Sequence, residues 1–168
     1  SAFWIAQDLA GNTSVFSVDN INIDKTAPVI IAEYKAQSAK DGEWFVAQPA
    51  ENIWFNGNIK VIFTASDLSG LMEYTKEIIL SSEGSNQSAS WIAQDLAGNT
   101  SVISVDKINI DKTAPVISSK CRIQSTDTEN WALVYPSENI WFNQNVQVAF
   151  SASDALSGMT QSSEYRIL

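Results

Sequence analysis

The sequence of 168 residues contains no histidine and a single cysteine, Cys121. One thiol cannot form a disulfide within the chain, so a buried core and backbone hydrogen bonds must hold the fold. Without histidine, the usual zinc sites, Cys–His pairs and Ser-His-Asp triads are excluded. No acid pair groups around a recognisable cleft motif either, so we expect a protein that is not an enzyme.

Positive charge is also scarce. Lysine and arginine total 10 residues against 19 aspartates and glutamates, which gives a formal net charge of −9. The few basic residues form no run or stripe, and an acidic chain repels phosphate backbones and anionic lipid headgroups. No apolar run approaches the roughly 18 residues that indicate a membrane-spanning helix. We therefore expect no nucleic-acid partner and no membrane insertion.

A long internal repeat dominates the sequence. Residues 1–30 align with residues 88–117, and residues 51–70 align more loosely with residues 138–158. The first pair of segments differs at only three positions: Phe3/Ser90, Phe16/Ile103 and Asn20/Lys107. The spacing of 87 residues, from Ser1 to Ser88, is long enough for a domain with its own core. The repeat therefore indicates tandem domains rather than a short-period solenoid.

Within each repeat, apolar residues recur at every second position, as in a strand with one buried face. The clearest examples are Val61, Phe63 and Ala65 in one repeat and Val148, Phe150 and Ala152 in the next. Between Val102 and Ile110 the alternation changes phase at Asp106–Lys107, which predicts a β-bulge.

Residues 71–80 could form a short helix or a strand. We favour a strand, because the apolar side chains then share one face of it: Met72, Tyr74, Ile78 and Leu80. Short strands, turn signals at intervals of about ten residues and no long helical pattern are typical of an immunoglobulin-type sandwich. The predicted fold class is all-β, with tandem immunoglobulin-like β-sandwiches.

Three short motifs recur in order. They are "DKTAP" at 24–28 and 111–115, "ASDLSG" at 65–70 with "ASDALSG" at 152–158, and "AQDLAGN" at 6–12 and 93–99. In this the chain resembles the bacterial Ig-like (BIg-type) tandem repeat domains of large cell-surface proteins and adhesins. The resemblance covers essentially the whole chain. It implies an extracellular location at the bacterial cell surface, a spacer or adhesive role, and neighbouring Ig-like units as partners.

The phase of the repeat predicts the domain boundaries. If "DKTAP" opens a unit, residues 25–111 form a complete Ig-like domain. Residues 1–24 are then the C-terminal hairpin of one unit, and residues 112–168 are the N-terminal strands of a further unit. These two end pieces are complementary. A sandwich without its last two strands exposes an apolar groove and unpaired edges, so something should fill it.

Three fillings remain open. The chain's own hairpin could complete its own strands, an identical chain could donate the hairpin, or the segment could belong to a longer array. Exchange between chains is favoured, because the linkers of an intact sandwich leave it at opposite poles. It would give a closed dimer or a head-to-tail fibre assembled by strand exchange.

Acidic and amide side chains fall in loops that an Ig sandwich gathers at one pole. For the complete domain they are Asp24, Asp67, Asp95 and Asn99, and for the combined ends they are Asp111, Asp154, Asp8 and Asn12. Such oxygens suit Ca²⁺ between domains, the one cofactor the sequence suggests. The alternative, that they cap turns while Lys25 or Lys112 neutralises them, is favoured, because Asp and Asn commonly cap turns.

Tryptophans also recur at the repeat spacing, as Trp4/Trp91, Trp44/Trp131 and Trp54/Trp141. Core packing is the favoured explanation, although exposed rings stack well on sugars. Trp54 and Trp141 are the candidate ligand-binding residues. The predicted function is a non-catalytic structural segment of a bacterial surface adhesin or fibre. The alternative is a carbohydrate- or protein-binding module attached to an extracellular enzyme or adhesin, with a host or matrix glycan or protein as its target.

Overall fold

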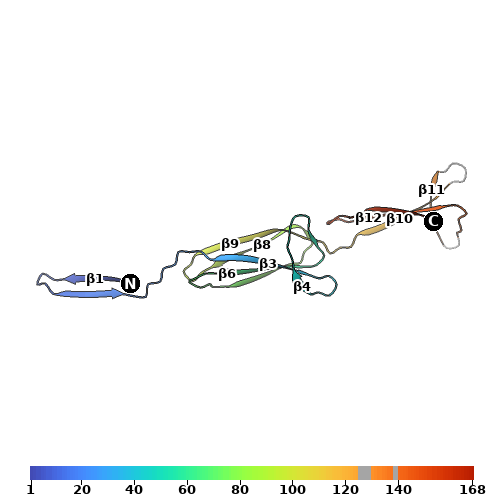
Figure 1. Cartoon of the computed structure of the whole chain (residues 1–168). Helices are drawn as coiled ribbons and strands as arrows, with labels where there is room; N and C mark the ends of the chain where they lie inside the picture. The colour runs from blue at the N-terminus through green and yellow to red at the C-terminus, as the bar shows by residue number, and fades with distance from the viewer. Residues whose placement is uncertain (125–129, 138–139) are drawn as a thin grey trace. The chain divides into compact units, whose positions relative to one another are not determined.

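The computed structural model describes residues 1–124, 130–137 and 140–168. The described residues form strands joined by loops, without a helix (Figure 1). This confirms the predicted all-β class. The strands are β1 (Ala2–Gln7), β2 (Thr13–Val18), β3 (Val29–Gln37), β4 (Trp44–Val46), β5 (Trp54–Phe55), β6 (Ile59–Ser66), β7 (Thr75–Leu80), β8 (Gly84–Gln94), β9 (Thr100–Ile110), β10 (Val116–Gln124), β11 (Trp131–Val134), β12 (Val146–Ser153) and β13 (Ser163–Ile167).

The strands form several sheets. Their strand orders are β1-β2, β4-β3-β6-β7, β5-β9-β8 and β11-β10-β12-β13. The last order repeats the second, strand for strand, as the internal repeat predicts. Several sheets without a helix between them are consistent with a β-sandwich.

Contacts between Cα atoms divide the chain into two compact units. The first comprises Ser1–Glu33, Ile62–Ile78 and Ser90–Val105, and the second comprises Tyr34–Val61, Ile79–Ala89 and Asp106–Leu168. Several strands run through both units. The boundaries drawn from the repeat, at residues 24 and 111, stay a prediction.

The core of the first unit contains an aromatic pair. The ring centroids of Phe63 on β6 and Trp91 on β8 lie 6.2 Å apart, with an angle of 34° between the ring planes. Phe63 is fully buried and Trp91 is 8% exposed. Because β6 and β8 belong to different sheets, this pair packs one sheet face against another. The period-two pattern of β6 is confirmed, since Val61, Phe63 and Ala65 are all buried.

The core of the second unit contains Ile59, Ile108 and Ile110, all fully buried. Strand β5 pairs in parallel with β9, with Trp54 opposite Asn109. The bend that follows β5 needs a glycine, because a Cβ on Gly57 would lie 1.9 Å from the carbonyl oxygen of Gln37.

The predicted phase change in β9 has a backbone counterpart. Lys107 has a left-handed φ of 61°, which shifts the alternation so that both Val105 and Ile108 are buried. The predicted strand over residues 71–80 is partly wrong. β7 begins at Thr75, while Met72 and Tyr74 precede it and are 72% and 57% exposed. Leu71 instead forms an isolated bridge with Asp95, which holds the segment away from the strand face we expected.

The apolar face predicted for residues 146–153 is present but only partly covered. These residues form β12, in which Val148 is half-buried and Phe150 is 39% exposed, whereas Phe63 at the same place in the repeat as Phe150 is fully buried. The order of the strands follows from the local pattern, but burial needs a second sheet over this face.

Candidate functional site

Three carboxylates predicted to share one pole do lie together in the first unit. One oxygen each from Asp24, Asp67 and Asp95 lies within 4.8 Å of the others. Asp24 precedes β3, Asp67 follows β6, and Asp95 follows β8, so three separate turns bring the group together. We call these three residues the acid cluster.

Hydrogen bonds within each turn hold two members of the cluster in place. The Asp67 Oδ1 atom accepts the amide and the hydroxyl of Ser69, both at 2.8 Å. Asp95 accepts the backbone amide of Asn99 at Oδ1 and its side-chain amide at Oδ2, both at 2.8 Å. Asp95 is 1% exposed, so these bonds replace its lost solvation. The predicted turn role of these residues is thus present in the structure.

Asp24 differs from its neighbours. Its Oδ1 accepts the Thr26 amide at 2.8 Å, and this hydrogen bond is the main reason that the pKa of Asp24 lies below its usual value. Its Oδ2 is buried and has no hydrogen-bond partner among the described residues. A buried carboxylate oxygen without a partner is costly, and either a cation or an ordered water molecule would relieve that cost.

Asn99, the fourth predicted residue, connects the cluster to the linker. Its side-chain amide donates to the Asp24 carbonyl oxygen at 3.2 Å as well as to Asp95. Ser101, two residues later, donates its hydroxyl to the Pro28 carbonyl oxygen. The turn between β8 and β9, together with the first residues of β9, therefore holds both ends of the "DKTAP" segment. Three carboxylates in one place supply the kind of oxygen ligand that Ca²⁺ prefers.

A partial copy of the cluster lies in the second unit. Ser157 links Asp111 and Asp154: its amide donates to Asp111 Oδ2 at 3.0 Å and its hydroxyl donates to Asp154 Oδ1 at 3.4 Å. The Ser157 side chain is the main cause of the lowered pKa of Asp111, a residue that is 7% exposed. Lys112 does not follow the predicted neutralising role, because its ammonium group donates to Asn58 and to the Ser81 carbonyl oxygen.

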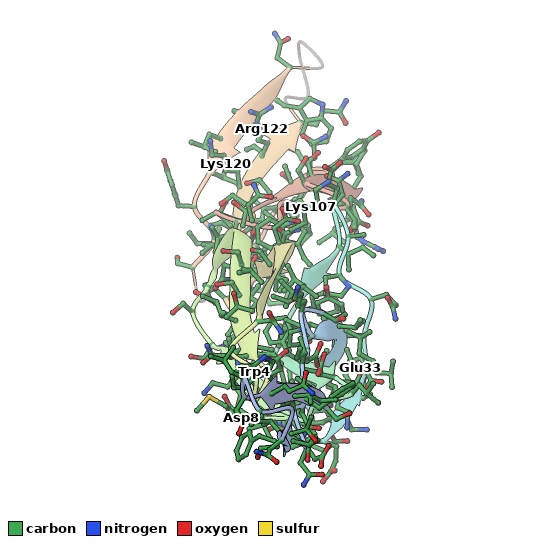
Figure 2. All side chains as sticks on the ribbon, turned by 90° about the vertical axis from the view of Figure 1, so that its left-hand side faces the viewer. Trp4, Asp8, Glu33, Lys107, Lys120 and Arg122 are labelled. Atoms are coloured by element: carbon green, nitrogen blue, oxygen red, sulfur yellow. The ribbon has the colours of Figure 1, made fainter. Side chains whose placement is uncertain are left out.

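The last two predicted residues, Asp8 and Asn12, lie in the turn of the β1–β2 hairpin (Figure 2 labels Asp8). Asn12 donates its backbone and side-chain amides to the two carboxylate oxygens of Asp8, both at 2.8 Å. The side-chain bond is the main cause of the lowered pKa of Asp8. That Asp8 and Asn12 join Asp111 and Asp154 in one site stays a prediction.

The two candidate ligand-binding tryptophans have different surroundings. Trp141 is 94% exposed, while Trp54 is half-buried and lines a polar pocket of about 340 Å³. The other residues of this pocket are Glu51, Asn52, Ser85, Asn86 and Asn109. Asn109 fixes its shape, because its side chain accepts the Asn86 amide at 2.8 Å and donates to the Ile53 carbonyl oxygen at 3.1 Å. The sequence drew attention to Trp54 but gave no sign of this amide-lined pocket.

Sequence reasoning also missed Glu83. Its carboxylate accepts the backbone amide of Lys112 at 2.6 Å and the hydroxyl of Thr113 at 2.9 Å. Glu83 lies in the segment 81–87, which has no counterpart in the first copy of the repeat. No repeated motif therefore marked Glu83, although its side chain contacts the residues that follow β9.

No family model, curated protein or solved structure matches this chain. Within the ranges that the structure describes, no helix is long and apolar enough to cross a bilayer.

Proposed function

We propose that this chain is a non-catalytic structural segment of a bacterial cell-surface adhesin or fibre, built from tandem Ig-like units that act as spacers. The observation that carries the proposal is the attachment of the "AQDLAGN" turn and the start of β9 to the "DKTAP" linker. Asn99 bonds to the carbonyl of Asp24, and Ser101 bonds to the carbonyl of Pro28. Such attachments fix the segment that enters a unit, which is what a spacer in a chain of domains requires.

The segment that leaves β9 is fixed as well. Glu83 accepts hydrogen bonds from the Lys112 amide and the Thr113 hydroxyl, and the Lys112 ammonium group donates to Asn58. Charge-assisted hydrogen bonds of this kind are among the stronger ones. Because the linker residues on both sides of residues 25–111 are held by hydrogen bonds, we expect tension to reach the paired strands before the linkers detach.

Within this proposal, the acid cluster binds Ca²⁺. The supporting observation is the buried, unpartnered Oδ2 of Asp24 beside the carboxylates of Asp67 and Asp95. A bound cation would supply the missing partner and would further fix the linker that carries Asp24.

Single-molecule stretching of the whole chain, held by its two ends, tests the spacer role. Residues 25–111 should unfold in one cooperative event that adds about 300 Å of contour length, less the distance between the two ends of the folded segment, given roughly 3.5 Å for each extended residue. Gradual extension without such an event would contradict the proposal. Antibodies raised against the chain should also label the surface of intact cells of its source, and purely internal labelling would contradict the location.

A second candidate function is carbohydrate binding, and the pocket beside Trp54 is the observation that favours it. Amide side chains and one aromatic ring are a combination that suits sugar hydroxyls and the apolar face of a pyranose. A glycan array should then retain specific sugars on the wild-type chain and lose them with Trp54→Ala. Equal binding by both chains, or none by either, would remove this candidate.

A further inference from the structure

We propose that the pocket beside Trp54 binds a single uncharged pyranose ring. In this site Lys107 is a positioning residue, because it holds the Glu51 carboxylate where that group accepts hydrogen bonds from the sugar hydroxyls. The inference rests on the second candidate function and deepens it, since it names the size and charge class of the ligand. The residues that line the pocket and Lys107 all belong to the second unit.

Two chain segments supply the polar walls of this pocket, and a left-handed asparagine turns the backbone in each. Asn52, in the turn before β5, has a φ of 67°, and Asn86, near the start of β8, has a φ of 53°. Asparagine adopts this conformation more easily than most side chains. Asn109, which is 5% exposed, joins the two segments through its bonds to the Asn86 amide and the Ile53 carbonyl oxygen. The walls are therefore formed without a ligand.

Three side chains of these walls keep their hydrogen-bonding groups available. Among the residues that the structure describes, none forms a hydrogen bond with the side-chain polar groups of Asn52, Ser85 or Asn86. Carboxamides and hydroxyls both donate and accept hydrogen bonds, as the hydroxyls of a sugar do. Polar groups that converge on one pocket are the usual means by which a small ligand is oriented.

The size of the pocket suits one sugar unit. Its volume of about 340 Å³ lies near the lower end of the range of about 300–1,000 Å³ that is usual for small-molecule sites. Of the described residues in its lining, the half-buried Trp54 is the one aromatic side chain. The flat face of an indole ring stacks on the C–H groups of one pyranose ring. A glycan would therefore be held by a single end unit.

The charge of the lining determines the class of sugar. Of the described lining residues only Glu51 is charged, and its Oε1 atom lies 2.6 Å from the Lys107 Nζ atom. That hydrogen bond is the main reason that the pKa of Glu51 lies below its usual value, so the carboxylate is ionised at neutral pH. An acidic sugar would be repelled by Glu51, and a cationic sugar would compete with Lys107 for it. An uncharged sugar has neither cost, and its hydroxyls can donate to the carboxylate.

Lys107 contributes more to the pocket than to the stability of the fold. Its φ of 61° equals that of Asn20, its counterpart in the first copy of the repeat, and asparagine accepts this conformation more easily than lysine. The side chains of Lys107 and Glu51 are 50% and 67% exposed, and exposed ion pairs add little stability. The result of having lysine at this position is a fixed carboxylate at the pocket.

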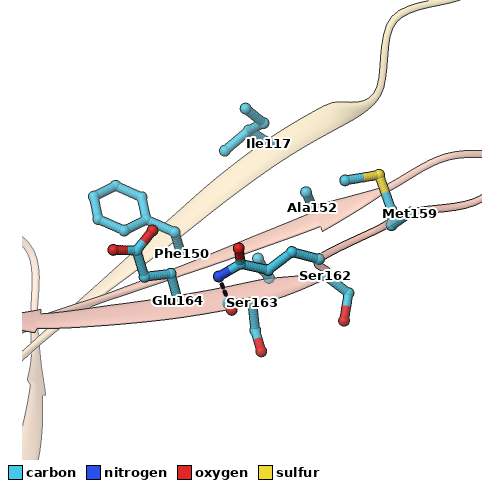
Figure 3. Close-up of a pocket in the computed structure, with 9 residues that line it drawn as sticks. Ile117, Phe150, Ala152, Met159, Ser162, Ser163 and Glu164 are labelled. Atoms are coloured by element: carbon cyan, nitrogen blue, oxygen red, sulfur yellow. Dashed lines mark hydrogen bonds between the residues drawn. The ribbon is translucent and has the colours of Figure 1, made fainter.

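The pocket beside Phe150, elsewhere in the second unit, provides a comparison (Figure 3). Its volume is about 430 Å³, and Ile117 and Met159 are among the apolar side chains of its lining. The one amide side chain among its described lining residues, that of Gln161, donates to the Ser163 carbonyl oxygen at 3.2 Å (dashed line in Figure 3). An aromatic ring without available amides is not expected to select sugars, so Phe150 serves as a control.

NMR titration of the full chain tests the ligand class, through the signals of the tryptophan indoles and the asparagine side-chain amides. The probes are the methyl pyranosides of glucose, galactose and N-acetylglucosamine, each compared with a charged analogue: glucuronic acid, galacturonic acid and glucosamine. At least one methyl pyranoside should saturate these signals, and its charged analogue should bind about 10-fold more weakly or worse. The free reducing sugars, titrated in parallel, distinguish a free monosaccharide from the end unit of a glycan as the natural ligand.

Two outcomes of this titration would overturn the inference in different ways. Equal binding of the charged and uncharged forms would leave carbohydrate binding intact but would exclude the selection that we assign to Glu51 and Lys107. Failure of every sugar in the panel to bind would remove the second candidate function together with the inference. The spacer function, which the stretching experiment tests, would stand in both cases.

Variants test the roles of the individual residues. Trp54→Ala should abolish saturation, and Phe150→Ala should leave it unchanged. Because Trp54 is part of β5, Glu51→Gln provides a second variant at an exposed side chain, and it should weaken binding by about 10-fold. Equal affinity in the wild-type chain and Glu51→Gln would overturn the inference.

Lys107→Asn tests the positioning role. It should weaken sugar binding by about 10-fold without lowering the denaturation midpoint, and Lys107→Arg, which keeps the cation, should restore most of the affinity. In Lys107→Asn the pKa of Glu51, followed through its carboxylate carbon signal, should rise towards the ordinary 4.5. Unchanged binding in Lys107→Asn, or a loss that Lys107→Arg does not restore, would contradict the positioning role.

Discussion

Residues 88–111 and residues 1–24 have nearly the same sequence and both form a strand, a turn and a strand, yet their environments differ. Trp91 is 8% exposed in one copy, and Trp4 is 72% exposed in the other. The local sequence is therefore sufficient for the hairpin but not for burial. Burial depends on the sheet that faces the hairpin, as it does for any element with one apolar face.

The turns of the two hairpins also form the same local hydrogen bonds in both environments. Asn12 bonds to Asp8 as Asn99 bonds to Asp95, with all four distances at 2.8 Å. Hydrogen bonds between residues four apart in sequence form in either environment. The hydrogen bond from Asn99 to the Asp24 carbonyl oxygen is different, because it joins residues far apart in sequence. It distinguishes the covered hairpin from the uncovered one.

The largest expected effect comes from truncating the buried tryptophan. Trp91→Ala should lower the free energy of unfolding of residues 25–111 by about 3–5 kcal/mol, because it removes the partner of Phe63 and leaves a cavity. Chemical denaturation followed by fluorescence and circular dichroism measures this loss.

Trp4→Ala is the matched control for that measurement. It should change the same transition by no more than about 0.5 kcal/mol, as expected for an exposed position. Similar losses for the two variants would contradict the assignment of Trp91 to the core and Trp4 to the surface.

The next largest effect is that of Ca²⁺ on thermal stability, which should depend on the acid cluster and not on the turn that holds Asp8. Saturation of the acid cluster at 100 times the dissociation constant stabilises the folded state by about 2.7 kcal/mol. Calorimetry with Ca²⁺ and with a chelator should therefore show a higher Tm for the unit that holds Asp24, Asp67 and Asp95. Asp67→Asn should abolish that rise, whereas Asp8→Asn should leave it intact. The same Tm in the presence of Ca²⁺ and of a chelator would exclude a cation at the cluster.

Removing one carboxylate without calcium should have a somewhat smaller effect. Asp95→Asn replaces an acceptor with an amide opposite the two donors of Asn99, so a buried donor loses its partner and stability falls by about 1–3 kcal/mol. The same change at Asp8 should cost less than about 0.5 kcal/mol, because water replaces the lost bond. Thermal melts of the two variants compare them directly.

Low pH should lower the stability of both copies of the repeat. The pKa values of Asp24, Asp111 and Asp8 lie below the ordinary 3.8 because amide and hydroxyl donors stabilise their charged forms. Unfolded chains then bind protons more readily than folded ones, so the stabilisation is present above about pH 4 and is lost as the pH falls through the folded values. Melting curves between about pH 6 and pH 3 should show Tm falling with pH, and a constant or rising Tm would contradict these shifts.

The smallest expected effect is at the left-handed residue that the two copies share, where they differ in residue type. Lys107 and Asn20 both have φ of 61°, a conformation that asparagine adopts more easily than lysine. Lys107→Asn also removes an exposed ion pair with Glu51, whose nitrogen–oxygen distance is 2.6 Å. At high salt, where that pair is screened, the variant should be more stable by a few tenths of a kcal/mol. Denaturation at low and high salt measures the difference.

Much of the local structure could be predicted from the sequence. The alternation along Ile59–Ser66 and the phase change at Lys107 follow from strand periodicity, and the grouping of Asp24, Asp67 and Asp95 follows from the expectation that their three turns share one pole. Such features depend on residues close together or on motifs that recur.

Features that depend on packing could not be predicted. Met72 and Tyr74 match a strand pattern, but the bridge of Leu71 to Asp95 takes that segment out of the strand. The exposure of Phe150 and Trp4 depends on which sheet covers them, and a period-two pattern carries no such information. Glu83 had neither a motif nor a repeated counterpart.

The position of Glu83 has a mechanical consequence. Tension applied beyond Thr113 reaches its carboxylate, and through Lys112 the carbonyl of Ser81, before it reaches the ladder of β9. The loop between β7 and β8 thus takes the first share of any load. Loops usually tolerate insertions easily, but a change in the length of this one would alter the force at which the strand behind it begins to peel.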